Sequence, residues 1–178
     1  MQEAIENNPL VILVDELDNQ IGVLDKLQAH QKGILHRAFS VFIFNSKGDL
    51  LLQKRASGKY HSPGLWTNTC CSHPYPDEDI MHAAKRRLKE EMGMECDLKS
   101  VFSFIYHVQL DQGMTEHEFD HVFIGYSDTL PLLNKEEAED YKYEPINLTL
   151  QDVKLYPGNY TEWFKIAIYR LATYLEVN

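Results

Sequence analysis

A charged residue inside the apolar face of a predicted helix is the feature that most restricts this chain. Over Asp77–Met92, the apolar side chains form one arc on a helical wheel of roughly 100° per residue: Ile80, Met81, Ala84, Leu88 and Met92. Glu91 falls inside that arc, one turn after Arg87, whereas Glu90 lies outside it near Arg86. A buried carboxylate is costly unless it pairs with a cation or binds a metal. A Glu91–Arg87 ion pair and a metal site both stay open as explanations.

Signals for β-hairpins dominate the remaining sequence. Asn45–Asp49 and Asp111–Gly113 are turn sequences between apolar or alternating runs, which is typical of hairpins. The long irregular stretch Ala56–Pro76 predicts a functional loop, because such loops are uncommon in compact domains. Strands are predicted over Leu10–Asp15, Ile21–Leu24, Ala38–Phe44, Leu50–Lys54, Val101–Leu110, Thr115–Tyr126 and Tyr143–Ile146.

Three helices are expected among these strands. The first covers Asp77–Met92, with Asp77 as N-cap, acidic residues in the first turn and Gly93 as the stop. A short acidic helix is expected near Lys135–Asp140, and a final amphipathic helix over about Thr161–Leu175. Many hairpins and few helices predict an α+β fold with a mixed β-sheet flanked by helices.

Length, charge and cysteine content narrow the class of protein. The 178 residues predict a single domain, with residues 1–9 as a loose N-terminal arm. The net charge of −10 argues against nucleic-acid or membrane partners. The polar N-terminus and the lack of a long apolar run lead us to expect a cytoplasmic protein. The odd number of cysteines, Cys70, Cys71 and Cys96, argues against a disulfide framework and leaves a thiol for chemistry.

The segment Ser72–Met94 resembles the Nudix box, a helical motif whose glutamates hold divalent ions against a pyrophosphate. The positions that match the box are Glu78, Arg86, Leu88, Glu90, Glu91, Gly93 and Met94. Two positions differ, because Ser72 replaces the first glycine and Arg87 replaces a glutamate of the metal cluster. The resemblance implies a Nudix-type fold and binding of a metal diphosphate, while the missing glutamate argues against hydrolysis.

Two further motifs and a pair of histidines, His30 and His36, resemble the type I isopentenyl diphosphate isomerases. Trp66-Thr67-Asn68 is followed by Cys71 two residues before His73, as in that family's catalytic loop. Glu116 and Glu118 match its Glu-x-Glu, and strand alternation places both, with Asp120, on one face. The resemblance implies one tightly bound divalent ion, Zn²⁺, Mn²⁺ or Mg²⁺, held by His30, His36, His73, Glu116 and Glu118.

The same resemblance assigns roles in moving a double bond of a small isoprenoid diphosphate. Glu118, with Tyr106 beside it, would deliver a proton to C4 while Cys71, with a lowered pKa, takes one from C2. Trp163 would face the developing cation. A second ion, Mg²⁺, would arrive with the diphosphate and use Glu91. The residues expected to contact the diphosphate are Lys26, Arg55, Lys59 and Arg87.

Two other functions compete with this isomerase hypothesis. A Nudix diphosphohydrolase would release phosphate or a monophosphate and would work without Cys71. A silent module would bind metal and diphosphate without turnover. We expect a monomer or weak dimer, and we interpret His107, His117 and His121 as structural or surface residues.

Overall fold

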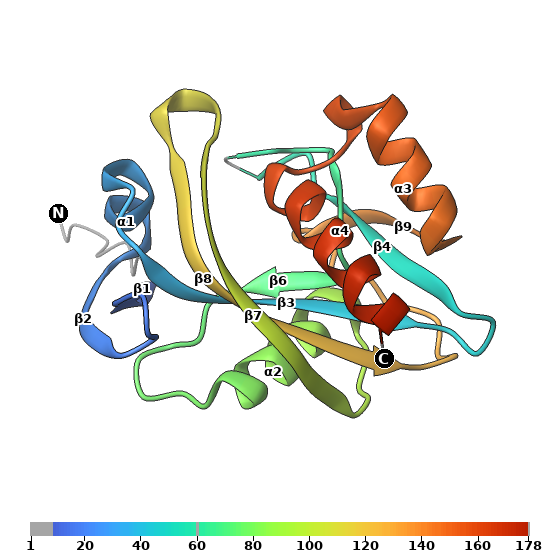
Figure 1. Ribbon diagram of the computed structural model, residues 1–178, viewed down its shortest axis with the longest axis horizontal. Coiled ribbons are helices and arrows are strands. Elements are labelled where there is room, and N and C mark those ends of the chain that lie inside the picture. Colours follow the sequence, from blue (N-terminus) through green and yellow to red (C-terminus); the bar gives the residue numbers. More distant parts are fainter. Residues whose placement is uncertain (1–8, 60, 178) are drawn as a thin grey trace, which may run out of the picture.

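The computed structural model describes residues 9–59 and 61–177 (Figure 1). Of the predicted arm over residues 1–9, only Pro9 lies within this part. The described strands are β1 (Leu10–Val14), β2 (Gln20–Asp25), β3 (His36–Phe44), β4 (Asp49–Arg55), β5 (Trp66–Thr67), β6 (Cys70–Ser72), β7 (Leu98–Gln109), β8 (Thr115–Tyr126) and β9 (Ala138–Pro145). The described helices are α1 (Lys26–Lys32), α2 (Ile80–Met92), α3 (Ile146–Leu155) and α4 (Glu162–Val177), with short 3₁₀ turns η1 (Asp111–Gly113) and η2 (Pro157–Asn159).

In the described part of the chain, the nine strands form one mixed sheet, which confirms the predicted α+β class. β3 is central: it pairs in parallel with β8, and antiparallel with β1, β4 and β6. β8 in turn pairs with β7, and β4 pairs with β9. Since β3 and β8 start at the same end of the sheet, residues at the beginning of both strands lie side by side.

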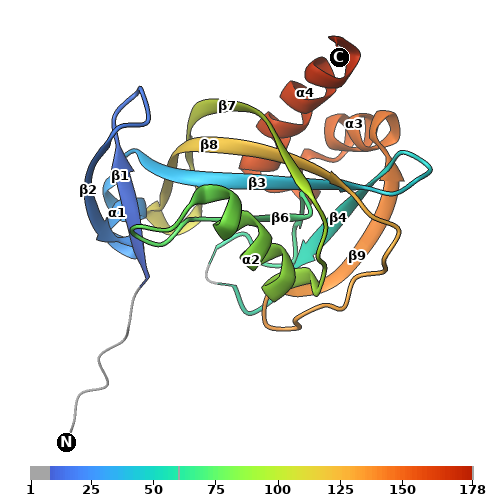
Figure 2. The same ribbon diagram turned by 90° about the horizontal axis from the view of Figure 1, so that it is seen from below.

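Helices cover both faces of the sheet, with α2 on one side and α3 and α4 on the other (Figures 1 and 2). Strand alternation divides the core accordingly. Phe42 of β3 packs in the cluster with Phe164 of α4, whereas Val41 packs in the cluster with Leu88 of α2. Each layer is therefore built from alternate residues of the same strands.

The helix that motivated the sequence argument begins two residues later than predicted. Asp79, not Asp77, is the N-cap of α2, and its side chain accepts a hydrogen bond from the amide of His82 at 2.9 Å. Asp77 has a φ of 64°, a left-handed conformation that belongs to the preceding turn. Gly93 ends the helix as predicted, with a φ of 62°. The apolar arc is confirmed, and Glu91 is buried within it.

Several other elements differ from those predicted from the sequence. The acidic helix predicted for Lys135–Asp140 is wrong, because that segment forms a turn and then β9, which pairs with β4. Two helices were not predicted, α1 and α3. β5 and β6 interrupt the long loop that follows β4. No helix among the described residues is long and apolar enough to cross a bilayer.

Candidate active site and metal centre

Five predicted metal ligands meet at one end of the sheet. Each of them offers a ligand atom, and these atoms all lie within 4.8 Å of one another. Four of the side chains are buried and that of His73 is half-buried. The cluster consists of His30, His36, His73, Glu116 and Glu118.

Strand pairing, strand alternation and a helix cap together explain why these residues meet. His36 is the first residue of β3 and lies opposite Glu118 in the parallel register with β8. Glu116 and Glu118 share the inner face of β8, as alternation predicts, and are 4% and 8% exposed. His30 reaches the cluster from α1, which Asp25 caps by accepting a hydrogen bond from the amide of Gln28 at 3.0 Å.

The donor set fits a divalent cation. Nδ1 of His36 donates to the carbonyl of Ile34 at 2.8 Å, so in the neutral ring the lone pair of Nε2 points into the cluster. Nε2 of His36 lies 3.2 Å from Nε2 of His73, which in turn lies 2.8 Å from Oε1 of Glu118. Nε2 of His30 lies 3.2 Å from Oε2 of Glu116. Imidazoles converging with carboxylates are ligands that Zn²⁺ and Mn²⁺ accept readily.

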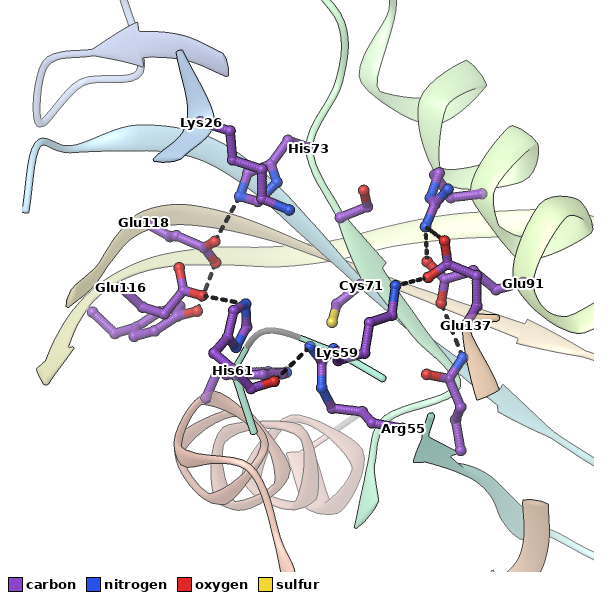
Figure 3. Close-up of a pocket in the computed structure, with 15 residues that line it drawn as sticks. Lys26, Arg55, Lys59, His61, Cys71, His73, Glu91, Glu116, Glu118 and Glu137 are labelled. Carbon is purple, nitrogen blue, oxygen red and sulfur yellow. Dashed lines mark hydrogen bonds and ion pairs between the residues drawn. The ribbon is translucent and has the colours of Figure 1, made fainter. Parts of the chain in front are cut away.

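A cavity of about 110 Å³ adjoins this cluster and is lined by Cys71, Tyr106, Glu118 and Trp163. Figure 3 shows Cys71 and Glu118 on the wall of this cavity. All four residues predicted to be catalytic therefore face one space. Cys71 comes from β6 and Glu118 from β8, two strands that flank β3 on opposite sides. The hydroxyl of Tyr106 donates to Oε2 of Glu118 at 2.6 Å.

The protonation of the acid–base pair differs from the expectation. Burial, and then the charge of Glu91, raise the pKa of the Cys71 thiol, so the prediction of a lowered pKa is wrong for the protein alone. Burial is the largest influence on Glu118 and acts to raise its pKa, but the hydrogen bond and charge of His36, together with hydrogen bonds with Glu116 and Tyr106, outweigh burial and lower that pKa. Cys71 is accordingly a thiol and Glu118 a carboxylate at neutral pH.

The four basic residues predicted for the diphosphate, Lys26, Arg55, Lys59 and Arg87, all line the same cavity. The guanidinium of Arg55 donates to the carbonyls of Ser62 and His61 at 3.2 and 3.1 Å, and it stacks over Trp163 at 5.2 Å. Burial lowers the pKa of Lys26, a half-buried residue at the start of α1.

Glu91 lines the cavity but stands apart from the five-residue cluster. Its carboxylate accepts hydrogen bonds from Nη2 of Arg87 at 2.5 Å and from Nε2 of Gln53 at 2.9 Å. The ion pair considered from the sequence is therefore present. The same carboxylate also lines the cavity, and its role as a metal ligand stays a prediction.

Sequence reasoning missed two titratable residues that line the cavity, His61 and Glu137. His61 lies edge-on to Trp163 at 5.6 Å, and burial followed by the charge of Arg55 lowers its pKa to about 3. The length of the loop that carries His61 was its only signal. Glu137 bonds Lys59 and Arg87, and it was assigned to a helix that does not form.

The remaining histidines of the hairpin lie on the outer face of β7 and β8, as expected. Nδ1 of His117 donates to the carbonyl of Gly33 at 2.9 Å. Nε2 of His121 lies 2.9 Å from Oδ2 of Asp18. These contacts fasten α1 and the β1–β2 turn to the sheet, which is a structural role.

Comparisons with known proteins agree with the fold and indicate the family. The NUDIX domain family matches residues 34–164. Isopentenyl-diphosphate Delta-isomerase 2 of Aromatoleum aromaticum is 51% identical over 94% of this chain and 89% of its own length. Isopentenyl-diphosphate Delta-isomerase 2 of Photorhabdus laumondii is 53% identical over 88% of each chain. A crystal structure from Deinococcus radiodurans superposes with a TM-score of 0.75 at 19% identity, covering 90% of this chain and 98% of that one, which shows a shared fold.

Proposed function

The chain belongs to the isopentenyl-diphosphate Delta-isomerases within the NUDIX domain family, and we propose that it interconverts isopentenyl diphosphate and dimethylallyl diphosphate. One observation carries the proposal. Cys71 and Glu118 line a single cavity from two different strands, and that cavity also holds four basic side chains. An alkene held between a thiol and a carboxyl group, with its diphosphate on the basic residues, satisfies the demands of the reaction.

The reaction needs one proton added at C4 of the alkene and one removed from C2. We assign the first transfer to the carboxyl group of Glu118, with the hydroxyl of Tyr106 bonded to it, and the second to the sulfur of Cys71. After one such turnover Glu118 has lost a proton and Cys71 has gained one. The pair therefore stands ready for the reverse reaction, from dimethylallyl to isopentenyl diphosphate.

The pKa directions support one of these two states for the protein without bound ions. A thiol at Cys71 and a carboxylate at Glu118 form the state that accepts dimethylallyl diphosphate. Conversion of isopentenyl diphosphate needs the opposite state, with a proton on Glu118 and a thiolate at Cys71. The hydrogen bond from Tyr106 keeps an exchangeable proton next to Glu118 in either state.

The surrounding residues bind and protect the substrate. Lys26, Arg55, Lys59 and Arg87 neutralise the diphosphate, and Trp163 presents an aromatic ring to the tertiary cation that develops between the two transfers. α4 brings Trp163 into the wall of the cavity, and we expect this helix to keep out water that would capture the cation as an alcohol.

We further propose that the five-residue cluster holds one Zn²⁺, Mn²⁺ or Mg²⁺ ion and that Glu91 binds a Mg²⁺ ion that enters with the diphosphate. When bound, the first ion supplies positive charge that orients Glu118 and tunes its proton affinity. A single domain over residues 1–178, a cytoplasmic location and a monomer or weak dimer without nucleic-acid or membrane partners remain predictions.

Incubation with isopentenyl diphosphate and Mg²⁺ in deuterated water tests the assignment. Deuterium should appear at C4 of dimethylallyl diphosphate, and after reversal at C2 of the isopentenyl diphosphate that is re-formed. Mass spectrometry and proton magnetic resonance locate the label. Product without deuterium would contradict the two-proton scheme.

Hydrolysis is the alternative, and the altered box argues against it. Arg87 occupies the position of a box glutamate, and its guanidinium donates a hydrogen bond to Glu91. An arginine at this position supplies no ligand for a metal ion. We therefore expect no release of inorganic phosphate from either diphosphate during the same incubation. Release of phosphate at a rate that Cys71→Ala leaves unchanged would favour a diphosphohydrolase.

A further inference from the structure

Glu137 places a carboxylate between two of the residues assigned to the diphosphate. Its Oε2 is bonded by Nζ of Lys59, and its Oε1 lies 3.3 Å from Nη2 of Arg87. Each carboxylate oxygen therefore pairs with one cation, as we expect the oxygens of a phosphate group to do when the substrate binds. Figure 3 shows Lys59 extended across the cavity toward this carboxylate and that of Glu91.

The backbone fixes Glu137 in this position. Its carbonyl accepts a hydrogen bond from the amide of Ala56 at 3.0 Å, and its amide donates to the carbonyl of Asn134 at 2.9 Å. Ala56 begins the loop that carries Lys59. The side chain of Glu137 is only 21% exposed, so the carboxylate belongs to the wall of the cavity.

A second carboxylate shares the same guanidinium group. Nη2 of Arg87 is bonded to Glu91 at 2.5 Å as well as to Glu137. The charged side chains that line the cavity, apart from the histidines, are four cations and four carboxylates: Lys26, Arg55, Lys59, Arg87, Glu91, Glu116, Glu118 and Glu137. The formal charges of these eight side chains cancel, and Lys59 and Arg87 in particular are already paired with Glu137, so a free polyanion must compete with that carboxylate for them.

We propose that Glu137 makes diphosphate binding depend on a divalent cation, so that the pocket selects a cation-complexed diphosphate and rejects the free anion. A free diphosphate must take Lys59 and Arg87 from Glu137, which leaves a carboxylate beside a phosphate group. A divalent cation bound to the diphosphate removes that repulsion and is attracted by Glu91 and Glu137 together. This inference rests on the proposed function for the roles of Lys59 and Arg87.

Calorimetric titration with methylenediphosphonate, which cannot be hydrolysed at its bridge, measures this dependence. For the unaltered chain we expect Mg²⁺ to tighten binding roughly a hundredfold, at the upper end of common coupling strengths. In Glu137→Gln the ligand should bind more tightly without Mg²⁺, and the gain from Mg²⁺ should fall at least about tenfold. Glu137→Asp, which keeps the charge, should recover most of the dependence.

Glu139→Gln is the matched control. Glu139 follows two residues later and pairs with Lys54 at 2.8 Å, but it does not line the cavity. Its substitution should leave the Mg²⁺ dependence unchanged, and thermal melting of every variant verifies folding. An unchanged dependence in Glu137→Gln, or equal weakening with and without Mg²⁺, would overturn the inference.

Isomerisation in deuterated water separates this inference from the proposed function. If the unaltered chain isomerises but Glu137→Gln keeps the full Mg²⁺ dependence of binding, only the role of Glu137 is refuted. If the unaltered chain shows the expected Mg²⁺ dependence and Glu137→Gln loses it, yet the unaltered chain exchanges no protons, the isomerase assignment fails and the role of Glu137 stands.

Discussion

Tyr106 and Glu118 lie directly opposite one another in the antiparallel register of β7 and β8, and the tyrosine hydroxyl donates a hydrogen bond of 2.6 Å to Oε2. The other oxygen, Oε1, faces His73 at 2.8 Å. The carboxyl group is therefore held from two sides, with one oxygen toward the metal cluster and one toward the tyrosine. Its orientation is fixed before any substrate binds.

Tyr106→Phe removes the hydroxyl that donates a hydrogen bond to Oε2 of Glu118. Since a hydrogen bond to a charged group contributes about 1.5–3 kcal/mol, we expect kcat to fall roughly 10- to 100-fold with KM little changed. Steady-state kinetics measure both constants. Tyr126→Phe, on the same sheet but 65% exposed, serves as the control and should keep the full rate. An unchanged kcat in Tyr106→Phe would remove this hydroxyl from the proposed mechanism.

Cys71→Ala and Glu118→Gln should each lower the isomerisation rate by at least about three orders of magnitude, near the upper range for acid–base groups. Proton exchange in deuterated water measures the residual rate. Cys96→Ala is the control for the thiol, because Cys96 lies outside the cavity. Metal content must be measured for Glu118→Gln, since that residue also belongs to the metal cluster. A rate near that of the unaltered chain in either variant excludes the altered residue.

Removal of metal should destabilise the fold, because the ligands come from α1, β3, β8 and the residue after β6. A cation at about 100 times its Kd stabilises the native state by about 2.7 kcal/mol. For a chain of this length that corresponds to a loss of roughly 5–10 °C in Tm on chelation. Calorimetry with and without chelator measures it, and His36→Ala should abolish the difference. His121→Ala, on the opposite face of β8, should retain it.

Periodicity in the sequence was sufficient for much of the site. The wheel placed Glu91 inside the apolar arc of α2, and alternation placed Glu116 and Glu118 together, because both patterns follow from local geometry alone. α1 gave no such signal. Its seven residues include only two buried ones, Ala29 and His30, so no apolar stripe marks it. Packing against the sheet, not propensity, makes it helical.

Contacts between distant segments could not be derived from the sequence. Glu137 reaches the cavity because β9 pairs with β4, and this pairing overrides the helical propensity of an acidic stretch. The raised pKa of Cys71 depends on burial under the completed fold, which the spacing of a motif does not contain. The choice between Asp77 and Asp79 as N-cap could not be made from the sequence either, because it depends on a local turn in which Asp77 has a positive φ.

Glu78→Gln should lower stability at neutral pH and have little effect in acid. Arg86 bonds both oxygens of Glu78, at 2.7 and 2.8 Å, and these hydrogen bonds lower the pKa of that carboxyl. A depressed folded-state pKa contributes stability above the unfolded pKa near 4.5, and the contribution is lost as pH falls through the folded value.

The expected loss for Glu78→Gln is about 1 kcal/mol at pH 7, since the pair is bidentate and mostly buried. Urea unfolding of both proteins across the acid range measures it. Glu136→Gln, at an exposed position of the turn before β9, should show no such trend. A difference that stays constant with pH would assign the loss to packing instead of charge.

Trp163 and Trp66 each lie beneath a cation, yet only Trp163 lines the cavity. Arg55 lies 5.2 Å from the ring of Trp163, and Lys142 lies 5.0 Å from that of Trp66. If Trp163 stabilises a developing cation, its contribution of roughly 1–2 kcal/mol depends on the electron density of the ring. Packing, by contrast, depends mainly on its shape.

The chain has two tryptophans, so in a Trp66→Phe background Trp163 is the only one. Biosynthetic incorporation of fluorinated tryptophans then withdraws electron density from this ring with little change in volume. We expect kcat to decrease stepwise with each added fluorine while Tm stays nearly constant, since the core around Phe164 and Ala167 is unchanged. The Trp66→Phe parent with ordinary tryptophan is the reference. A flat series would make Trp163 a packing residue, because an electrostatic role cannot be insensitive to the quadrupole of the ring.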